Sequence, residues 1–144
     1  MNFKDCAADV KEDRATIFIV DDDCGVRESI KALLEPCGFE CLAFESGEAF
    51  LDGLRQQVSP HGCAILDLRL KGMSGLAVLR ELRHSHPCVV TVLVTAFADI
   101  KLVFDAMESG ATSVVAKPYR DQELWEAVSS CLAIAEERVA SRRL

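Results

Sequence analysis

The chain has 144 residues, a length typical of a single domain that buries a substantial core. Half of the residues are hydrophobic and 27% are charged, which is an ordinary globular composition. Asp and Glu outnumber Lys and Arg by 23 to 16, giving a net charge of −7. Direct binding to nucleic acid or to an anionic membrane surface is therefore not expected. No apolar run approaches the roughly 18 residues that a membrane-spanning helix requires.

The seven cysteines do not indicate a disulfide framework. Their number is odd, no C-x-x-C pair occurs, and several of them fall inside apolar runs. Buried free thiols in a reducing compartment are therefore expected. Residues 1–15 carry charges where a signal peptide would need an apolar stretch, so a cytoplasmic protein is predicted.

The segment HSHPC offers His84, His86 and Cys88 as candidate metal ligands. A structural zinc site needs four ligands, and no fourth ligand lies nearby in the sequence. A polar loop before a strand is the favoured interpretation.

The first half of the chain alternates between short apolar runs and amphipathic stretches. TIFIV, residues 16–20, predicts a strand buried on both faces. GVRESIKALLEPCG, residues 25–38, carries a helical apolar stripe and predicts a helix. ECLAF, residues 40–44, predicts a second strand, and Ser46 is then a suitable N-cap for a helix over 47–57.

The second half of the chain continues this alternation. Along the sequence, the pattern predicts a strand over 62–67, a helix over 74–85, a strand over 88–95, a helix over 98–110, a strand over 111–118 and a helix over 121–140. Five strands alternating with five helices, joined by short connections, indicate a parallel sheet that is covered on both faces.

Polar residues stand at the carboxyl ends of four of these strands. Asp21 and Asp22 follow the first strand, Asp67 ends the third, Thr95 ends the fourth, and Lys117 lies near the end of the fifth. The carboxyl ends of parallel strands form the binding crevice of such a sheet, so these side chains are expected to converge. Three crowded carboxylates repel one another. The pattern therefore predicts a site for a hard divalent cation with oxygen ligands.

Four fragments in this order, IVDDD, ILDLRLKGMSG, LVTAFAD and AKPY, strongly resemble the receiver domain of two-component response regulators. The resemblance covers residues 14–138 and is greatest to receivers of the FixJ/NarL kind. It implies a flavodoxin-like α/β fold: a five-stranded, parallel, doubly wound sheet of order 2-1-3-4-5 with helices on both faces. It divides the chain into an N-terminal tail at 1–13, a receiver domain at 14–140, and a C-terminal tail or linker start at 141–144.

The resemblance also implies a role for each acidic residue at the crevice. Asp67 matches the phosphoacceptor of the family. Asp21 and Asp22 match the acidic pair that positions Mg²⁺, and Asp67 with the backbone carbonyl of Arg69 completes the protein ligands. The chemistry is consistent with these roles, because a carboxylate that attacks phosphorus needs neighbouring positive charge.

Two further residues and a partner surface follow from the same resemblance. Thr95 matches the hydroxyl that binds a phosphoryl oxygen, and Lys117 matches the family lysine. The phosphoryl group would come from a sensor histidine kinase or a phosphotransfer protein, so the chain is expected to be a signalling switch rather than an enzyme. An effector domain or a second copy of the chain is expected to bind the face around Leu102, Val114 and Trp125.

The sequence departs from the family pattern at several positions. Lys71 replaces a common proline after the phosphoacceptor, and Val114 stands where the family usually has a switch aromatic. The two side chains expected to flank an attacking water are Arg69 and Phe97, and neither is a water-positioning acid or amide. Slow loss of the phosphoryl group is therefore predicted.

Two other functions remain open from the sequence alone. DDDCG also resembles the D-x-D motif of haloacid-dehalogenase-type phosphatases, with Asp21 as nucleophile and Asp23 as acid/base. That family's final acidic motif is missing, however, and Asp67 would have no role. The second alternative is a degenerate receiver that acts only as a protein-binding module, which rests on Lys71 and Val114.

Overall fold

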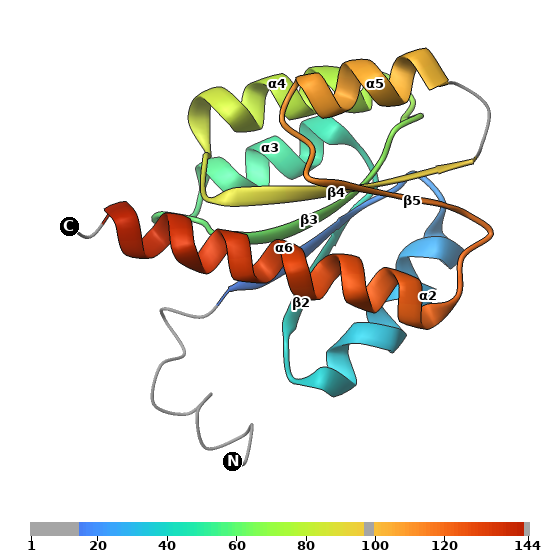
Figure 1. Cartoon of the computed structure of the whole chain (residues 1–144), viewed down its shortest axis with the longest axis horizontal. Coiled ribbons are helices and arrows are strands. Elements are labelled where there is room, and N and C mark those ends of the chain that lie inside the picture. Colours follow the sequence, from blue (N-terminus) through green and yellow to red (C-terminus); the bar gives the residue numbers. More distant parts are fainter. Residues whose placement is uncertain (1–14, 97–99, 143–144) are drawn as a thin grey trace.

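The computed structural model describes residues 15–96 and 100–142 (Figure 1). Within these ranges, one parallel sheet contains five strands in the order β2-β1-β3-β4-β5, so the predicted fold class is confirmed. The strands are β1 (Thr16–Val20), β2 (Glu40–Phe44), β3 (Gly62–Asp67), β4 (Val89–Ala96) and β5 (Ser113–Lys117).

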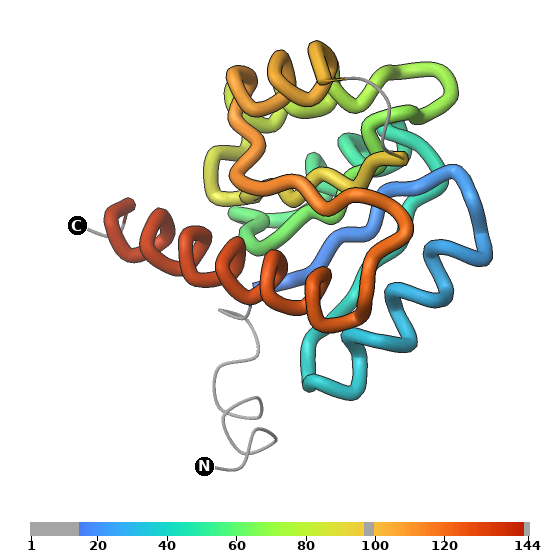
Figure 2. Tube along the Cα trace, turned by 45° about the vertical axis from the view of Figure 1, so that its right-hand side comes forward, coloured from blue at the N-terminus to red at the C-terminus, as the bar shows by residue number. Residues whose placement is uncertain are grey.

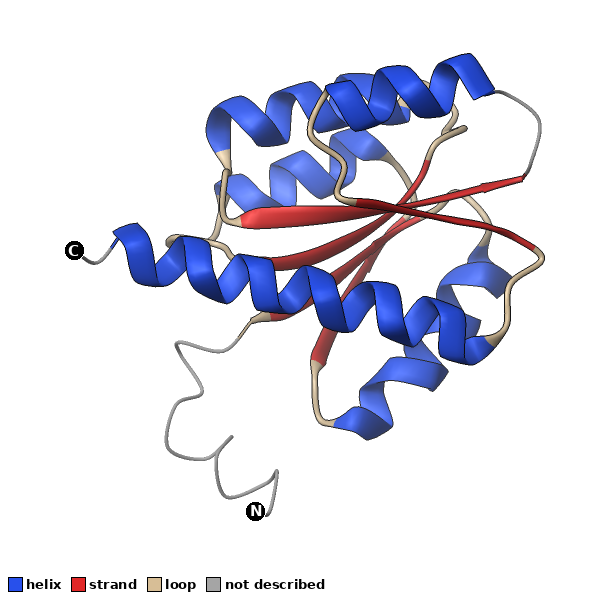
Figure 3. Cartoon of the chain, in the orientation of Figure 1, coloured by secondary structure: helices blue, strands red, loops and turns tan. Residues whose placement is uncertain are grey.

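Helices cover both faces of this sheet. They are α2 (Cys24–Leu34), α3 (Gly47–Arg55), α4 (Gly75–Ser85), α5 (Ile100–Glu108) and α6 (Asp121–Arg142), with a short 3₁₀ turn, η2 (Glu35–Cys37), after α2. Helices α3, α4 and α5 lie on one face, and α2 and α6 lie on the other (Figure 3). The tube view in Figure 2 shows the chain passing repeatedly from strand to helix and back. None of the helices in the described part of the chain is long and apolar enough to span a membrane.

The helix ends differ from the sequence prediction by one to a few residues, and α2 and α6 are two examples. The helix predicted over 25–38 begins at Cys24, because the Asp23 carboxylate caps it by accepting two N–H groups of the first turn. It ends at Leu34 and passes into η2, because Pro36 has no N–H with which to continue the helical ladder. Helix α6 continues to Arg142, past its predicted end at 140.

Two apolar clusters fill the space between the sheet and its helices. Successive strand residues point to opposite faces. Thus Ile17 and Ile19 pack with α2 and α6, whereas Phe18 and Val20 pack with α3, α4 and α5. All four side chains are fully buried. Burial on both faces is typical of the central strands of a parallel sheet.

The three residues of the predicted partner face pack on both sides of the sheet. Leu102 and Val114 pack against the cluster on the α3, α4 and α5 side, but Trp125 packs against the cluster on the opposite face of the sheet. Its ring centroid lies 6.0 Å from that of Phe39. The reason is that α6 crosses the sheet on the face opposite to α5, as Figure 1 shows. Trp125 therefore packs on a different core cluster from Leu102 and Val114, and the partner face stays a prediction.

Candidate functional site

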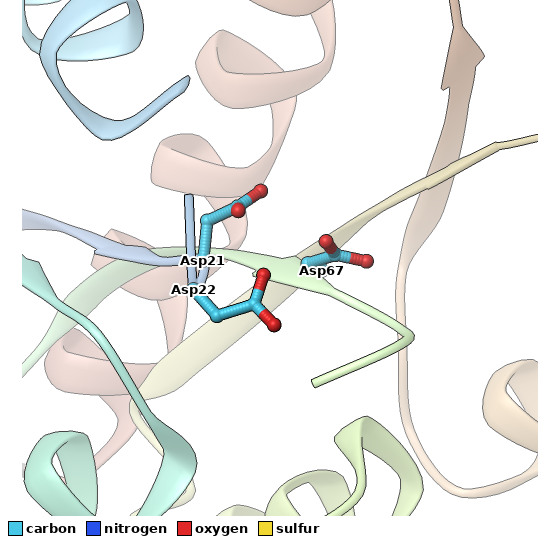
Figure 4. Close-up of side chains that lie close together, drawn as sticks. All are labelled: Asp21, Asp22 and Asp67. Atoms are coloured by element: carbon cyan, nitrogen blue, oxygen red, sulfur yellow. The ribbon is translucent and has the colours of Figure 1, made fainter. Parts of the chain in front are cut away.

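Three carboxylates meet at the carboxyl ends of the two central strands. Asp21 and Asp22 follow β1 directly, and Asp67 is the last residue of β3. Since Val20 and Leu66 are register partners, the residues after them emerge side by side. One oxygen from each carboxylate lies within 4.8 Å of the others, and Figure 4 shows the three groups projecting into one space.

Asp21 is the buried member of this triad, with 3% of its surface exposed. Its Oδ1 accepts a hydrogen bond of 2.8 Å from the backbone N–H of Asp23. Burial raises the pKa of the Asp21 carboxyl, and the negative charges of Asp67 and Asp22 raise it further. The Asp23 N–H and the Lys117 ammonium act in the opposite direction. The ionised triad is therefore short of positive charge.

Lys117 supplies positive charge to two of the three carboxylates. It is the last residue of β5, yet its Nζ lies 3.6 Å from Asp21 Oδ2 and 3.6 Å from Asp67 Oδ2. The lysine side chain is long enough to reach past the end of β4 from the neighbouring strand. The Lys117–Pro118 peptide bond is cis. The two distances of 3.6 Å place the ammonium where it can offset negative charge on Asp67 and on a group bound to Asp67.

Thr95 lies next to the triad at the end of β4. Its neighbour Val94 is the register partner of Asp67, so Thr95 lies one residue farther along its strand than Asp67 does. The side chain is buried, and its Oγ1 donates a long hydrogen bond of 3.4 Å to the Ala96 carbonyl. Such a bond is weak and easily exchanged for a better acceptor. Phe97 lies outside the described residues.

The loop after Asp67 is held from two directions. The backbone N–H of Arg69 donates to Asp67 Oδ1 at 2.9 Å, which orients the carboxylate. Farther along, the N–H of Met73 donates to Glu48 Oε1 at 3.3 Å, so the start of α3 anchors the loop that lacks the usual proline. The sequence does not indicate this role of Glu48, because a bond across 25 residues leaves no local signal.

Two more residues near the site were missed. Asp23 is the N-cap of α2, and an Asp directly before a helical apolar stripe is the signal that could have identified it. Arg27, in α2, donates from NH1 to the backbone carbonyl of Asp21 at 2.7 Å. No spacing rule in the sequence indicates that bond.

The alternative metal site is not formed. Among the residues that the structure describes, the acidic triad is the one group of three or more potential ligands that converge. His84, His86 and Cys88 are not part of such a group, and the loop interpretation of HSHPC holds only from His86 onward, because His84 lies in the last turn of α4.

A doubly wound α/β domain with an acidic triad and a lysine at its carboxyl edge defines a class of signalling domain. The family model of the response regulator receiver domain matches residues 17–129. The chain belongs to this family. The phosphatase and the degenerate-module alternatives are not favoured, since the match covers most of the chain and its sequence retains Asp21, Asp22, Asp67, Thr95 and Lys117.

Individual relatives agree with this assignment. The transcriptional regulatory protein TdiR of Thauera aromatica is 35% identical over 124 residues, covering 85% of this chain and 53% of that protein. FixJ of Bradyrhizobium diazoefficiens is 30% identical over 125 residues, covering 87% of this chain and 60% of that protein. The solved structure of the response regulator StyR is 35% identical with a TM-score of 0.81, covering 90% of this chain and 65% of that one. The chain thus spans little more than half the length of these curated relatives.

Proposed function

We propose that this receiver domain takes a phosphoryl group onto Asp67 and works as a phosphorylation-controlled switch. The donor is a phosphohistidine of a sensor histidine kinase or of a phosphotransfer protein. The observation that carries the proposal is the position of Lys117, whose ammonium is 3.6 Å from both Asp67 and Asp21. An ammonium in this position can stabilise the negative charge of a phosphoryl group on Asp67, which a lysine with a purely structural role would not need to do.

The residues divide the work of the transfer. A carboxylate oxygen of Asp67 attacks phosphorus as the phosphorus–nitrogen bond of the donor breaks, so an acyl phosphate forms and the electron pair stays on the imidazole. The Arg69 N–H holds the second oxygen of Asp67 and so aims the first. Lys117 offsets the charge of the transferred group, and the Thr95 hydroxyl exchanges its long bond to Ala96 for a phosphoryl oxygen.

A magnesium ion fits the donor set at this site. The carboxylates of Asp21, Asp22 and Asp67 offer hard oxygen ligands, which Mg²⁺ prefers, and the backbone carbonyl of Arg69 would add a fourth. When bound, the ion supplies positive charge to the phosphoryl oxygens. The two neighbouring carboxylates differ in access to the ion. Asp21 is buried and held by its backbone contacts, whereas Asp22 is exposed and would contact an arriving ion first.

The organisation of the chain follows from the same proposal. We assign the described residues up to Arg142 to the receiver domain, because α6 continues past the predicted boundary at 140; residues 1–13 and 143–144 lie outside the described part of the chain. The domain acts in the cytoplasm, where histidine kinases present their phosphohistidine. With a net charge of −7, it works through protein contacts and does not bind nucleic acid itself.

The output surface lies on α5. Ile100, Phe104 and Met107 are spaced by four and three residues, and 84%, 62% and 42% of their surfaces are exposed. Residues at this spacing share one side of a helix. Exposed apolar stripes of this kind support association, so we assign the stripe, with Leu102 and Val114 beneath it, to contact with a second copy or an effector domain.

Labelling with a small phosphodonor tests the proposal. With Mg²⁺ and acetyl phosphate, the purified chain should gain one phosphoryl group that is stable in acid and released by hydroxylamine. Asp67→Asn should abolish the gain. Asp52→Asn is the matched control, because Asp52 is an exposed carboxylate paired with Arg55 and should leave labelling intact. Labelling that persists in Asp67→Asn, or steady turnover of a phosphomonoester by the unaltered chain, would contradict the proposal.

A further inference from the structure

Arg27 makes an unexpected contact with the corner that carries two of the three acidic residues. It lies in the first turns of α2, is half-buried, and donates from NH1 to the backbone carbonyl of Asp21 at 2.7 Å. This is a short, charge-assisted hydrogen bond, stronger than one between neutral groups. Asp21 is where the paired part of β1 ends, so its carbonyl has no further strand position to bind.

The other polar groups of Asp21 already have hydrogen-bond partners. The Asp21 N–H donates to the Phe44 carbonyl at 3.2 Å, and Asp21 Oδ1 accepts from the Asp23 N–H. Asp23 in turn caps α2 and accepts an N–H from Arg27 at its carbonyl, at 3.1 Å. The side chain and N–H of Asp21 are thus already fixed. The carbonyl contact with Arg27 fixes the plane of the peptide that leads into Asp22.

That peptide plane sets the direction of the Asp22 side chain. Asp22 is exposed, and within the described part of the chain no hydrogen bond orients its carboxylate. We infer that Arg27 is a positioning residue of the cation site: its bond to the Asp21 carbonyl holds the turn so that Asp22 faces Asp67. The inference rests on the proposed function, since it concerns the same Mg²⁺ site.

The charge of Arg27 and its positioning of the turn have opposite effects on Mg²⁺ binding. An experiment can therefore distinguish the two roles. A guanidinium close to the acidic triad opposes the binding of a divalent cation. If Arg27 acted by charge alone, its removal would strengthen Mg²⁺ binding. If it acts by holding the turn, removal weakens binding, because residues that orient metal ligands are typically worth about 10–100-fold in affinity.

The experiment is calorimetric titration of the chain with MgCl₂ at fixed ionic strength. Arg27→Ala should raise the dissociation constant about tenfold. Arg27→Lys keeps the charge and one donor and should restore part of the affinity. The control is Lys31→Ala, which removes the same charge one turn farther along α2 and should leave the constant unchanged or slightly lower. Thermal melting without Mg²⁺ checks folding, and Arg27→Gln carries the same prediction if Arg27→Ala does not fold.

Phosphorylation provides a readout that a general loss of stability would not move. In Arg27→Ala, the Mg²⁺ concentration for half-maximal labelling should rise about tenfold, while the rate at saturating Mg²⁺ recovers to the unaltered value. An Arg27→Ala variant that binds Mg²⁺ as tightly as the unaltered chain, or more tightly, would overturn the positioning role alone. An unaltered chain that neither binds Mg²⁺ nor becomes labelled would instead refute the proposed site, and this inference with it.

Discussion

The two sides of the sheet's carboxyl edge are built differently. At the β1 and β3 side, Asp21 is fixed through its N–H, its carbonyl and its carboxylate, and Asp67 is oriented by a bond of 2.9 Å. At the β4 and β5 side, the Thr95 hydroxyl has a single long bond of 3.4 Å to its own neighbour. Val114 there has no ring to swing, and α5 exposes Ile100 and Phe104 to solvent.

This contrast separates two physical requirements. Transfer of a phosphoryl group needs charges held in place before the reaction, so the acceptor side is rigid. A switch needs an element with two arrangements of similar free energy, so the responding side has to be loosely held. In this chain the departures from the family pattern lie on both sides: Lys71 is in the loop after Asp67, and Val114 is in β5. We expect the chemistry to be ordinary for a receiver and the output to depend on α5 rather than on an aromatic at 114.

The largest effect should come from the residue that joins the two sides. Lys117→Met removes the ammonium shared by Asp21 and Asp67, so labelling by acetyl phosphate should slow by about 10²-fold. The domain without Mg²⁺ should also melt at a lower temperature, since two carboxylates lose their counter-charge. The control is Lys101→Met, an exposed lysine on α5. Equal labelling rates in both variants would show that Lys117 is a solvated strand cap.

Much of this architecture is readable from the sequence. Strands such as TIFIV are buried on both faces, so their composition marks them strongly, and parallel strands bring their carboxyl ends together by topology alone. The convergence of the acidic residues with Lys117 followed from that geometry.

Other features depend on distances that no local pattern encodes. The bonds from Arg27 to Asp21 and from Met73 to Glu48 are set by how α2 and α3 pack on the sheet. The sequence also does not show that Trp125 packs on the other side of the sheet from Leu102 and Val114. Only the rotation of α6 determines that Trp125 turns toward Phe39. Helix periodicity reports an apolar stripe but not the neighbour that it meets.

The lifetime of the phosphorylated state tests how far the acceptor side controls reset. The guanidinium of Arg69 provides donors and no acceptor, so it cannot take a proton from an attacking water. Arg69→Glu should therefore shorten the half-life of phosphorylated Asp67, by about tenfold, which is below the usual contribution of an optimised general base. Loss of radiolabel from the purified phosphoprotein measures the rate.

The matched control for the half-life is Arg80→Glu. Arg80 is exposed on α4, so this substitution makes the same change of charge away from the site. Two outcomes would contradict the expectation of slow reset: an unaltered chain that loses its label within seconds, or two variants that lose it at the same rate.

A smaller effect is expected when the acidic triad loses one charge. Asp22→Asn relieves repulsion with Asp21 and Asp67, so the Mg²⁺-free domain should melt roughly 2–4 °C higher. The same change removes a ligand, so Mg²⁺ should raise the melting temperature less than it does in the unaltered chain. Scanning calorimetry with and without millimolar Mg²⁺ gives both quantities. A melt of the unaltered chain that ignores Mg²⁺ would mean that the triad does not bind the ion.

The smallest effect is expected at Trp125, the only tryptophan in the chain. Because its ring packs against Phe39 on the face opposite to α5, a change that starts at Thr95 and passes through α5 should scarcely reach it. Saturation of Asp67 with beryllofluoride should therefore leave Trp125 emission nearly constant. In the double variant Phe104→Trp with Trp125→Phe, the reporter stands on the exposed stripe of α5, and its emission should shift under the same titration. A large change at Trp125 with none at position 104 would reverse the comparison: the response would then pass through α6 and the Phe39 side of the sheet.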